Sequence, residues 1–454
     1  MTRPKFILVT GKKSKSMIIG IDIKFFEAEK PDEVNDGKLY LNDDGKNYID
    51  FQGTLQDAFR LIKVIFAKAV DSEEKYTLVN CCFRQSVSNS YRFVINELYK
   101  GDFIDAVTEG ACIEAEARIT GLTNWINHPR IKPEVIFSPD EQSKITIKNS
   151  FSVSFPISSI EKIELIESCG KVYSRNETVL RNLSQIKLTC SQPISRLEAY
   201  KNIVGFIKLL SLFAESLPDL TRLNFSFTSG KTVEYLSTKK TENPDENEAL
   251  LTYDKIEPHF SVMLKIFYQS RDKFVRVLDL LIASVKNSTA EISFLNITTA
   301  FEVFHKYFME KNNEPLRKKF FNELKADGLV QTDRGKWDQI IRYHHLFELT
   351  KDIQFFKQNF QNPRKTIALI RDSRNYYTHY SEQKDEIWTP NRLIFANKAL
   401  RQLLKAVVLK ELELPENLIN KLLNNRAAIF YQDFENNEYS LHYTGTSPIN
   451  DELY

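Results

Sequence analysis

"STKKTENPDENEAL" (237–250) separates two parts of the 454-residue chain that differ in character. The stretch is almost free of apolar side chains and contains a proline, so it cannot bury enough surface to order itself. We therefore interpret residues 237–252 as a linker. Strand-like runs dominate before it and helical periodicity dominates after it, which predicts an α+β fold with an antiparallel β-rich domain followed by an all-α domain.

The N-terminal domain (1–236) is predicted from short apolar or alternating runs of strand length. These runs are "KFILVT", "SMIIGIDIKFF", "YTLVNCCF", "ACIEAEARIT", "KITIKNSFSVSF" and "QIKLTC". "LNDDGKNYIDF" (41–51) places Asp44-Gly45 between two further runs, which indicates a hairpin because the tightest such turn needs positive φ at both residues. A helix is predicted near 55–69, another over 196–214, and a strand pair over 222–236.

The C-terminal domain (253–430) is predicted to be a helical bundle. Two sets of large apolar residues recur at the spacing of one helix face. The sets are Phe274, Leu278, Leu281, Ile282 and Val285, and then Phe294, Ile297, Phe301, Phe304 and Phe308. Further helices are predicted over 314–326, 337–359, 363–380 and 391–411, with antiparallel neighbours because the connections are short. We assign no structure to the tail (431–454).

Composition limits the partners and the compartment. Lys and Arg number 62 and Asp and Glu number 60, so no long-range positive field gathers nucleic acid and an RNA site must be a local patch. The five cysteines include no C-x-x-C pair, which favours a reducing compartment. The first residues lack a signal-peptide pattern, and no apolar run reaches about 18 residues. We expect a cytoplasmic protein with no membrane partner.

"RDSRNYYTHY" (371–380) gathers polar side chains on a helix that is otherwise apolar and aromatic. At about 100° per residue, Arg371, Asn375 and His379 form one row along the helix. The spacing R-N-x-x-x-H is expected by chance only about 0.05 times in a chain of this composition. The apolar stripe of the helix also runs into Arg374. Because a buried unpaired arginine costs several kcal/mol, Arg374 must meet an anion, a carboxylate or solvent.

"RNYYTHY" (374–380) resembles the R-[polar]-x-x-x-H signature of HEPN domains, a helical superfamily rich in metal-independent ribonucleases. The R-N-x-x-T-H-Y form is similar to that of ApeA-type anti-phage proteins, which join a β-rich N-terminal domain to a C-terminal HEPN domain. "SFLNITTAFEVFHKYF" (293–308) is similar to the first HEPN helix, and "ITGLTNWINHP" (119–129) is similar to a Leu-x-x-Trp segment of the N-terminal domain.

The resemblance implies an RNA endonuclease of phage defence, in which the N-terminal domain senses or regulates. It implies catalytic roles for Arg374 and His379, supported by Asn375, Glu302 and Thr378. Histidine suits proton transfer, and the planar fork of arginine suits a phosphate whose charge grows during the reaction. It implies no metal and no other cofactor.

The implied partners are RNA, with tRNA as one candidate, a phage-derived trigger and a second copy of the chain. One histidine cannot serve as both base and acid on opposite sides of phosphorus, so we expect a homodimer or higher homo-oligomer in which two motifs face one cleft. Arg371, Arg364 and Lys365 are predicted to extend an RNA-binding rim.

Two alternatives stay open. The helical domain is a non-catalytic HEPN dimerisation or RNA-binding module, in which Arg374 makes a structural ion pair with Glu302. Alternatively, the same arginines bind a nucleotide or another anion.

Overall fold

A computed structural model describes most of the two predicted domains. The described residues are 6–8, 17–42, 45–52, 61–87, 90–127, 134–136, 144–146, 151–157, 160–173, 178–214, 218–236, 249–286, 289–310, 322, 334–360, 362–379, 386–424, 428–432 and 439–443. The chain divides into two compact units: Met1–Ile207 with Pro218–Glu248, and Lys208–Leu217 with Ala249–Tyr454. The α+β class predicted from the sequence is confirmed.

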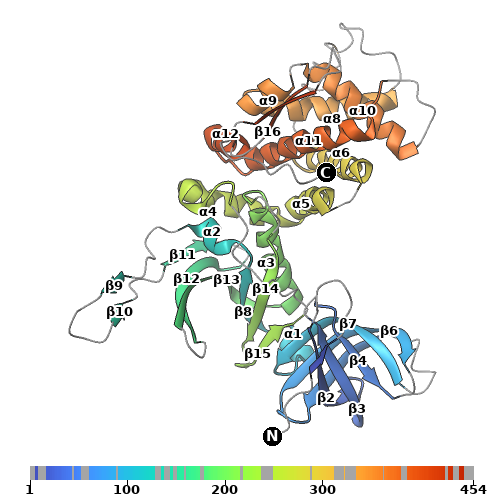
Figure 1. The fold of residues 1–454 in the computed structure, drawn as a ribbon, viewed down its shortest axis with the longest axis vertical. Coiled ribbons are helices and arrows are strands. Elements are labelled where there is room, and N and C mark those ends of the chain that lie inside the picture. Colours follow the sequence, from blue (N-terminus) through green and yellow to red (C-terminus); the bar gives the residue numbers. More distant parts are fainter. Residues whose placement is uncertain are drawn as a thin grey trace. The chain divides into compact units, whose positions relative to one another are not determined.

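The first unit contains a closed antiparallel barrel (Figure 1). Its strands pair in the order β7, β4, β3, β2, β5, β6, and β6 pairs with β7 to close the ring. Their bounds are β2 (Met17–Glu27), β3 (Lys30–Asn42), β4 (Tyr48–Phe51), β5 (Ile62–Ala69), β6 (Lys75–Val87) and β7 (Ser90–Gly101). The short β1 (Phe6–Leu8) pairs with β2.

Strand β7 also begins an open antiparallel sheet. Its last residues pair with β15, and the order continues through β14, β8, β13 and β12 to β11. The bounds are β15 (Thr232–Tyr235), β14 (Leu220–Phe227), β8 (Cys112–Ile119), β13 (Thr178–Ile194), β12 (Lys162–Tyr173) and β11 (Phe151–Pro156). A separate hairpin consists of β9 (Glu134–Ile136) and β10 (Lys144–Thr146), and the helices of this unit are α1 (Ala106–Glu109), α2 (Leu122–Ile126) and α3 (Arg196–Leu210). Strand β7 therefore belongs to both the barrel and the open sheet, which are the two halves of one continuous sheet.

Alternation of side chains explains the barrel core and corrects one prediction. In β5, Ile65, Ala67 and Ala69 are buried while Lys68 between the last two is exposed, as on a strand with one face inward. The helix predicted near 55–69 is therefore wrong for residues 62–69, where period-2 burial and pairing with β2 and β6 prevail. Residues 53–60 lie outside the described residues.

The predicted hairpins are confirmed. Strands β3 and β4 pair across the segment around Gly45, which has φ 78°, while Asp44 lies outside the described residues. The pair predicted over 222–236 is β14 with β15. The predicted helix over 196–214 is α3, although it ends at Leu210.

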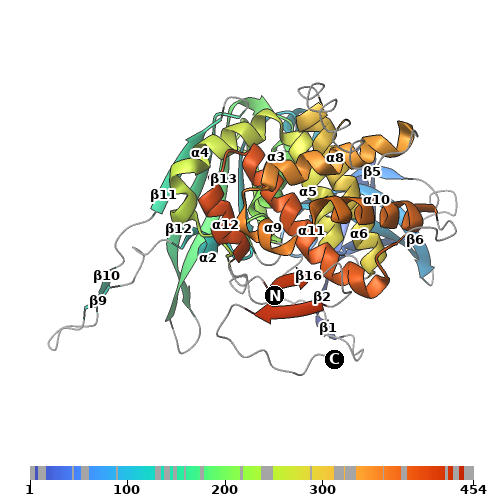
Figure 2. The same ribbon diagram turned by 90° about the horizontal axis from the view of Figure 1, so that it is seen from above.

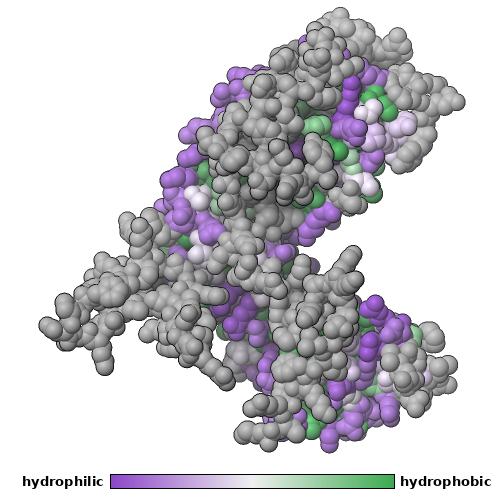
Figure 3. Space-filling model, viewed as in Figure 1, coloured by the Kyte–Doolittle hydropathy of each residue, from purple (hydrophilic) through white to green (hydrophobic). Residues whose placement is uncertain are grey.

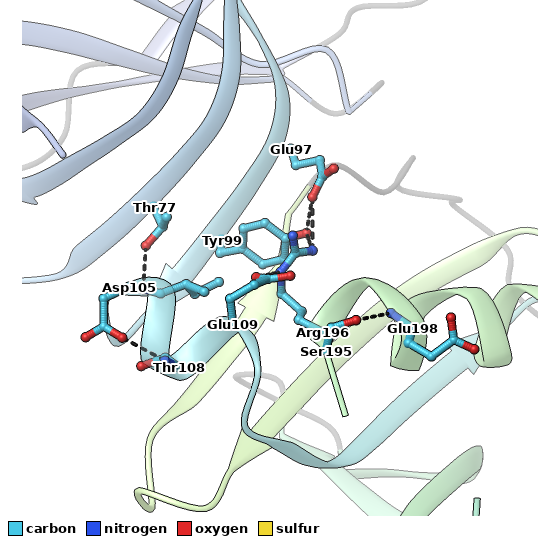
Figure 4. Close-up of polar contacts among 10 residues, drawn as sticks. Thr77, Glu97, Tyr99, Asp105, Thr108, Glu109, Ser195, Arg196 and Glu198 are labelled. Carbon is cyan, nitrogen blue, oxygen red and sulfur yellow. Dashed lines mark hydrogen bonds and ion pairs between the residues drawn. The ribbon is translucent and has the colours of Figure 1, made fainter. Parts of the chain in front are cut away.

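Arg196 at the start of α3 joins three elements of the first unit (Figure 4). Its guanidinium pairs with Glu109 of α1 at 2.8 Å and with Glu97 of β7 at 3.0 Å. It also lies 4.5 Å from the ring centroid of Tyr99 and donates a hydrogen bond to the Tyr99 hydroxyl. Burial raises the pKa of Tyr99. The Arg196 side chain is only 7 % exposed, so its charge depends on these partners.

The Arg196→Ala substitution is expected to lower the free energy of unfolding of the first unit by about 2 to 3 kcal/mol, because two carboxylates lose their cation inside the cluster. Urea denaturation measures the loss. The matched control is Arg222→Ala, which removes a 44 % exposed arginine from its pair with Glu234 and should change stability by less than about 1 kcal/mol. Equal effects of the two substitutions would contradict the assignment.

The second unit is a helical bundle around α6 (Figure 2). Helix α6 packs against α5, α8, α10 and α11. The elements are α4 (Tyr253–Gln269), α5 (Arg271–Lys286), α6 (Ala290–Phe304), the π-helix η2 (His305–Met309), α8 (Arg334–Thr350), α9 (Gln354–Asn359), α10 (Pro363–His379), α11 (Pro390–Glu411), α12 (Glu416–Asn424) and the hairpin β16 (Ala428–Gln432) with β17 (Tyr439–Tyr443). The helices predicted over 363–380 and 391–411 are α10 and α11.

The helix predicted over 337–359 is two helices. Helix α8 ends at Thr350, whose hydroxyl bonds back to the carbonyl of Leu346 at 3.0 Å, and α9 begins at Gln354. Between them the backbone of Ile353 is extended, and its side chain is fully buried. Ile353 therefore anchors the connection between the two helices in the core. The helix predicted over 314–326 lies outside the described residues except for Asn322.

Hydrophilic residues make up most of the coloured surface on the face seen in Figure 3. The large apolar side chains that are exposed lie far apart in the sequence, for example Val34, Leu197 and Ile394. Among the helices that the structure describes, none has the length and apolar character needed to cross a membrane.

Candidate active site

The C-terminal half of α10 is held in place by the chain that leads into α11. The buried Ser373 hydroxyl accepts the Trp388 N–H at 2.9 Å, and the Tyr377 hydroxyl donates to the Trp388 carbonyl at 2.8 Å. The Trp388 ring is 1 % exposed and lies edge-on to Phe294 of α6. These contacts fix the position of the helix end that carries the polar residues.

Arg374 is fixed by a carboxylate from α6. Its Nε lies 3.3 Å from Glu302 Oε1, and its Nη2 lies 3.5 Å from Glu302 Oε2. The two side chains remain 21 % and 19 % exposed, respectively, so the pair reaches solvent. Buried Tyr343 of α8 donates its hydroxyl proton to Glu302 Oε1 at 3.3 Å. Burial raises the pKa of Tyr343, with the nearby Glu302 charge as a second cause, which keeps the hydroxyl a donor.

His379 is exposed at the last residue of α10. Asn375, one turn earlier, is half-buried, and the described part of the chain offers neither side chain a hydrogen-bond partner. Thr378 is exposed and donates its hydroxyl proton to the Arg374 carbonyl at 2.7 Å, so it supports the backbone of this turn. Because five residues turn a helix by about 140°, Arg374 and His379 diverge from one another around the helix axis.

The three residues predicted to form an RNA-binding rim make separate contacts. Arg371 pairs with its neighbour Asp372 at 2.6 Å, so RNA would have to compete with that carboxylate. Lys365 lies 4.0 Å from Glu386 and projects about 100° away from Arg364 around the helix. Arg364 is exposed near the start of α10. The three residues therefore do not form one continuous surface.

Sequence reasoning missed the contribution of α8. Tyr343, which completes the contacts of Glu302, carries no motif, and only its helical spacing from other buried residues could have indicated that it faces the core.

His345 of α8 is buried, and its Nδ1 lies 2.8 Å from Nε2 of His305 on the π-helix, with the two rings stacked. Burial lowers the pKa of His345 to about 4, so its ring is neutral at physiological pH.

A metal site does not emerge from the described residues. No three His, Cys, Asp or Glu side chains among them lie close enough together to hold an ion. The arrangement on α10 instead offers a fixed cation at Arg374 and an exposed imidazole at His379. Those groups suit a phosphate and a proton, respectively.

The fold and this geometry agree with two family models. The model described as ApeA N-terminal domain 1 matches residues 23–265, which is more than half of the chain. The chain belongs to the ApeA family. The model described as Apea-like HEPN matches residues 295–418 of this ApeA-family chain, and that range contains Glu302, Arg374 and His379. No significant match exists among the curated proteins or the solved structures.

Family membership supports an anti-phage defence nuclease.

The Leu-x-x-Trp segment, on which the N-terminal resemblance to ApeA rested, is part of the core. Leu122 and Trp125 of α2 are 1 % and 4 % exposed, and α2 packs against β13. These two residues are therefore buried where α2 packs against the open sheet, and they present almost no surface to a ligand.

Proposed function

We propose that this ApeA-family chain is a metal-independent RNA endonuclease in the cytoplasm, activated during phage infection. The observation that carries the proposal is the end of α10, where an arginine held by Glu302 and an exposed histidine both reach solvent. The Arg374 pair leaves part of the guanidinium open at 21 % side-chain exposure. A phosphate could therefore approach Arg374 without displacing Glu302.

The reaction uses the nucleophile that RNA itself carries. His379 takes the proton of the 2′-hydroxyl, whose oxygen attacks phosphorus to form a 2′,3′-cyclic phosphate. Arg374 donates to the phosphate oxygens, where negative charge increases in the transition state. The departing 5′-oxygen receives a proton from a second histidine. Asn375 lies one helical turn before His379, where it would help to orient the imidazole.

The second histidine would come from a second copy of the chain. Within one copy, Arg374 and His379 diverge by about 140° around α10, so one helix does not aim both groups at one phosphate. Two α10 helices facing each other would bring both pairs to one groove. We therefore propose a homodimer or higher oligomer as the active form, with tRNA among the candidate substrates and a phage-derived trigger that acts through the first unit.

The purified full chain is expected to keep a basal activity without the trigger, and therefore to cut RNA in the presence of EDTA and to leave 2′,3′-cyclic phosphate ends. The ends follow from attack by the 2′-hydroxyl, and insensitivity to EDTA follows from protein groups that supply all the proton transfers. Treatment with a phosphatase that spares cyclic phosphates identifies the ends, and a DNA copy of the substrate is the control. Cleavage of both, or loss of cleavage in EDTA, would contradict the mechanism.

The ion pair itself supports a second candidate function. Arg374 and Glu302 are close enough to form a purely structural contact, with Tyr343 as a third member. Under this alternative the helical unit is a non-catalytic module for dimerisation or for binding RNA or a nucleotide. This alternative predicts that neither the wild-type protein nor any variant cleaves RNA.

A further inference from the structure

A pocket of about 470 Å³ lies within the second unit, between α8, α9 and the start of α10. Three aromatic rings line it. Phe347 of α8 meets Phe360 edge to face at 5.1 Å, and Phe356 of α9 stacks with Phe360 at 5.9 Å. This volume falls within the range of sites that hold small organic groups. The rings of Phe347, Phe356 and Phe360 are 7 %, 4 % and 6 % exposed, so they offer ring edges to a ligand.

Contacts with other helices hold the walls of this pocket. The first backbone N–H of α9, at Gln354, donates to Oδ1 of Asn420 on α12 at 2.9 Å. The Lys410 ammonium of α11 donates to the Leu349 carbonyl of α8 at 2.7 Å. The positions of α8 and α9 are therefore determined by the rest of the bundle, so the cavity is built into the fold.

Positive charge collects at the rim. Lys351, Lys357 and Arg364 line the pocket, and Glu348 is the single carboxylate among its lining residues. The Lys351 and Lys357 side chains are 61 % and 60 % exposed, and both pair with surface carboxylates that cost little to exchange for another anion. Exchange of these carboxylates for a phosphate would leave both ammonium groups facing the phosphate, although the whole chain carries a net charge of only +2.

The pocket and Arg374 share one face of α10. At about 100° per residue, Arg364 and Ile367, which line the pocket, lie within an arc of about 80° that also contains Arg371 and Arg374. Ten residues separate Arg364 from Arg374, or about 15 Å along the helix axis. A single RNA strand a few nucleotides long spans this distance.

We propose that the pocket binds one unstacked base of the RNA substrate, a few nucleotides from the bond that is cut. The base packs against the exposed edges of Phe356 and Phe360, and its backbone phosphate lies at the rim formed by Lys351, Lys357 and Arg364. Contact with aromatic rings and a cationic groove are the two means by which proteins hold single strands without reading every base. This inference rests on the proposed function and adds where the substrate is held.

Binding is measured separately from cleavage, with the full chain carrying His379→Ala and a fluorescein-labelled ten-nucleotide oligouridine. In this background, the double substitution Lys351→Glu with Lys357→Glu is expected to weaken binding about tenfold or more and to flatten its salt dependence. Phe356→Leu, which keeps an apolar side chain, is expected to weaken binding about fivefold through lost contact with the ring edge. The matched control is the double substitution Lys265→Glu on α4 with Lys273→Glu on α5, which makes the same charge change on two exposed lysines outside the pocket.

A scan of the oligonucleotide locates the base. An abasic ribose is placed at each position in turn, and one position should weaken binding to the chain with an intact pocket. The same position should have no effect on the Phe356→Leu chain, since the pocket then contributes little to lose. A loss of affinity at one abasic position identifies a pocket for one base. If the strand were held by diffuse surface charge, the abasic ribose would have the same small effect at every position.

The outcomes separate this inference from the proposed function. If wild-type protein cuts RNA but the rim and Phe356 variants bind oligouridine within twofold of the control, the pocket is not a subsite and the nuclease proposal stands. If the rim variants lose binding of uridine monophosphate but not of oligouridine, the pocket takes a free nucleotide and the inference is overturned. If wild-type protein neither cuts nor binds RNA, the proposed function itself fails.

Discussion

The His379→Ala substitution is expected to reduce RNA cleavage by about a thousandfold or more, because the reaction loses its proton acceptor in each copy and its proton donor in the partner. Stability should change little, since the side chain is exposed and the described residues give it no hydrogen bond. Initial rates on labelled RNA measure the effect, and thermal unfolding checks the fold.

A control histidine in the same unit sharpens this test. His259→Ala on α4 removes an imidazole that is partly exposed and lies outside the α10 site. The His259→Ala variant should cut RNA at the wild-type rate. If His379→Ala cuts as fast as His259→Ala, the histidine has been assigned wrongly and the non-catalytic alternative gains support.

Replacing Arg374 separates catalysis from structure. Arg374→Ala is expected to lower cleavage by about 10²- to 10³-fold, because the phosphate loses a cation that acts where charge develops. It should also lower the free energy of unfolding by about 1 to 2 kcal/mol, since the Tyr343 hydroxyl is then the one partner that the described residues give Glu302. Rates and urea denaturation are measured on the same preparations.

The double variant Arg374→Met with Glu302→Gln then decides between the two functions. It removes both charges, so most of the lost stability should return while cleavage stays absent. Under the purely structural alternative, wild type and both variants are equally inactive and differ only in stability. A double variant that regains cleavage along with stability would show that Arg374 acts only by neutralising Glu302.

Periodicity was sufficient to predict the two-part architecture, but not the way in which its sheet is connected. Alternation identifies a strand such as β8 from its own residues, whereas the closure of β6 on β7 depends on pairings between distant segments. The misassigned β5 shows the limit. A short run of apolar and lysine residues satisfies helical and strand spacing almost equally, and only its neighbours β2 and β6 decide between them.

For the candidate site, the motif alone located Arg374 and His379 on one helix, and pairing with Glu302 was expected as one alternative. The role of Tyr343 and the pocket beside α9 were not predictable, because each depends on how α8 packs against α6 and α10. Arg364 was expected in a rim with Lys365 and Arg371. Helical geometry separates Lys365 from that face, and the pocket gives Arg364 different neighbours.

The double use of β7 has a mechanical consequence for a domain expected to sense infection. Its backbone completes the barrel through β4 and β6 and anchors the open sheet through β15. A force applied to the barrel would therefore act on the same strand that anchors the open sheet. Strain from a bound trigger would thus pass from one half to the other along the continuous backbone of β7.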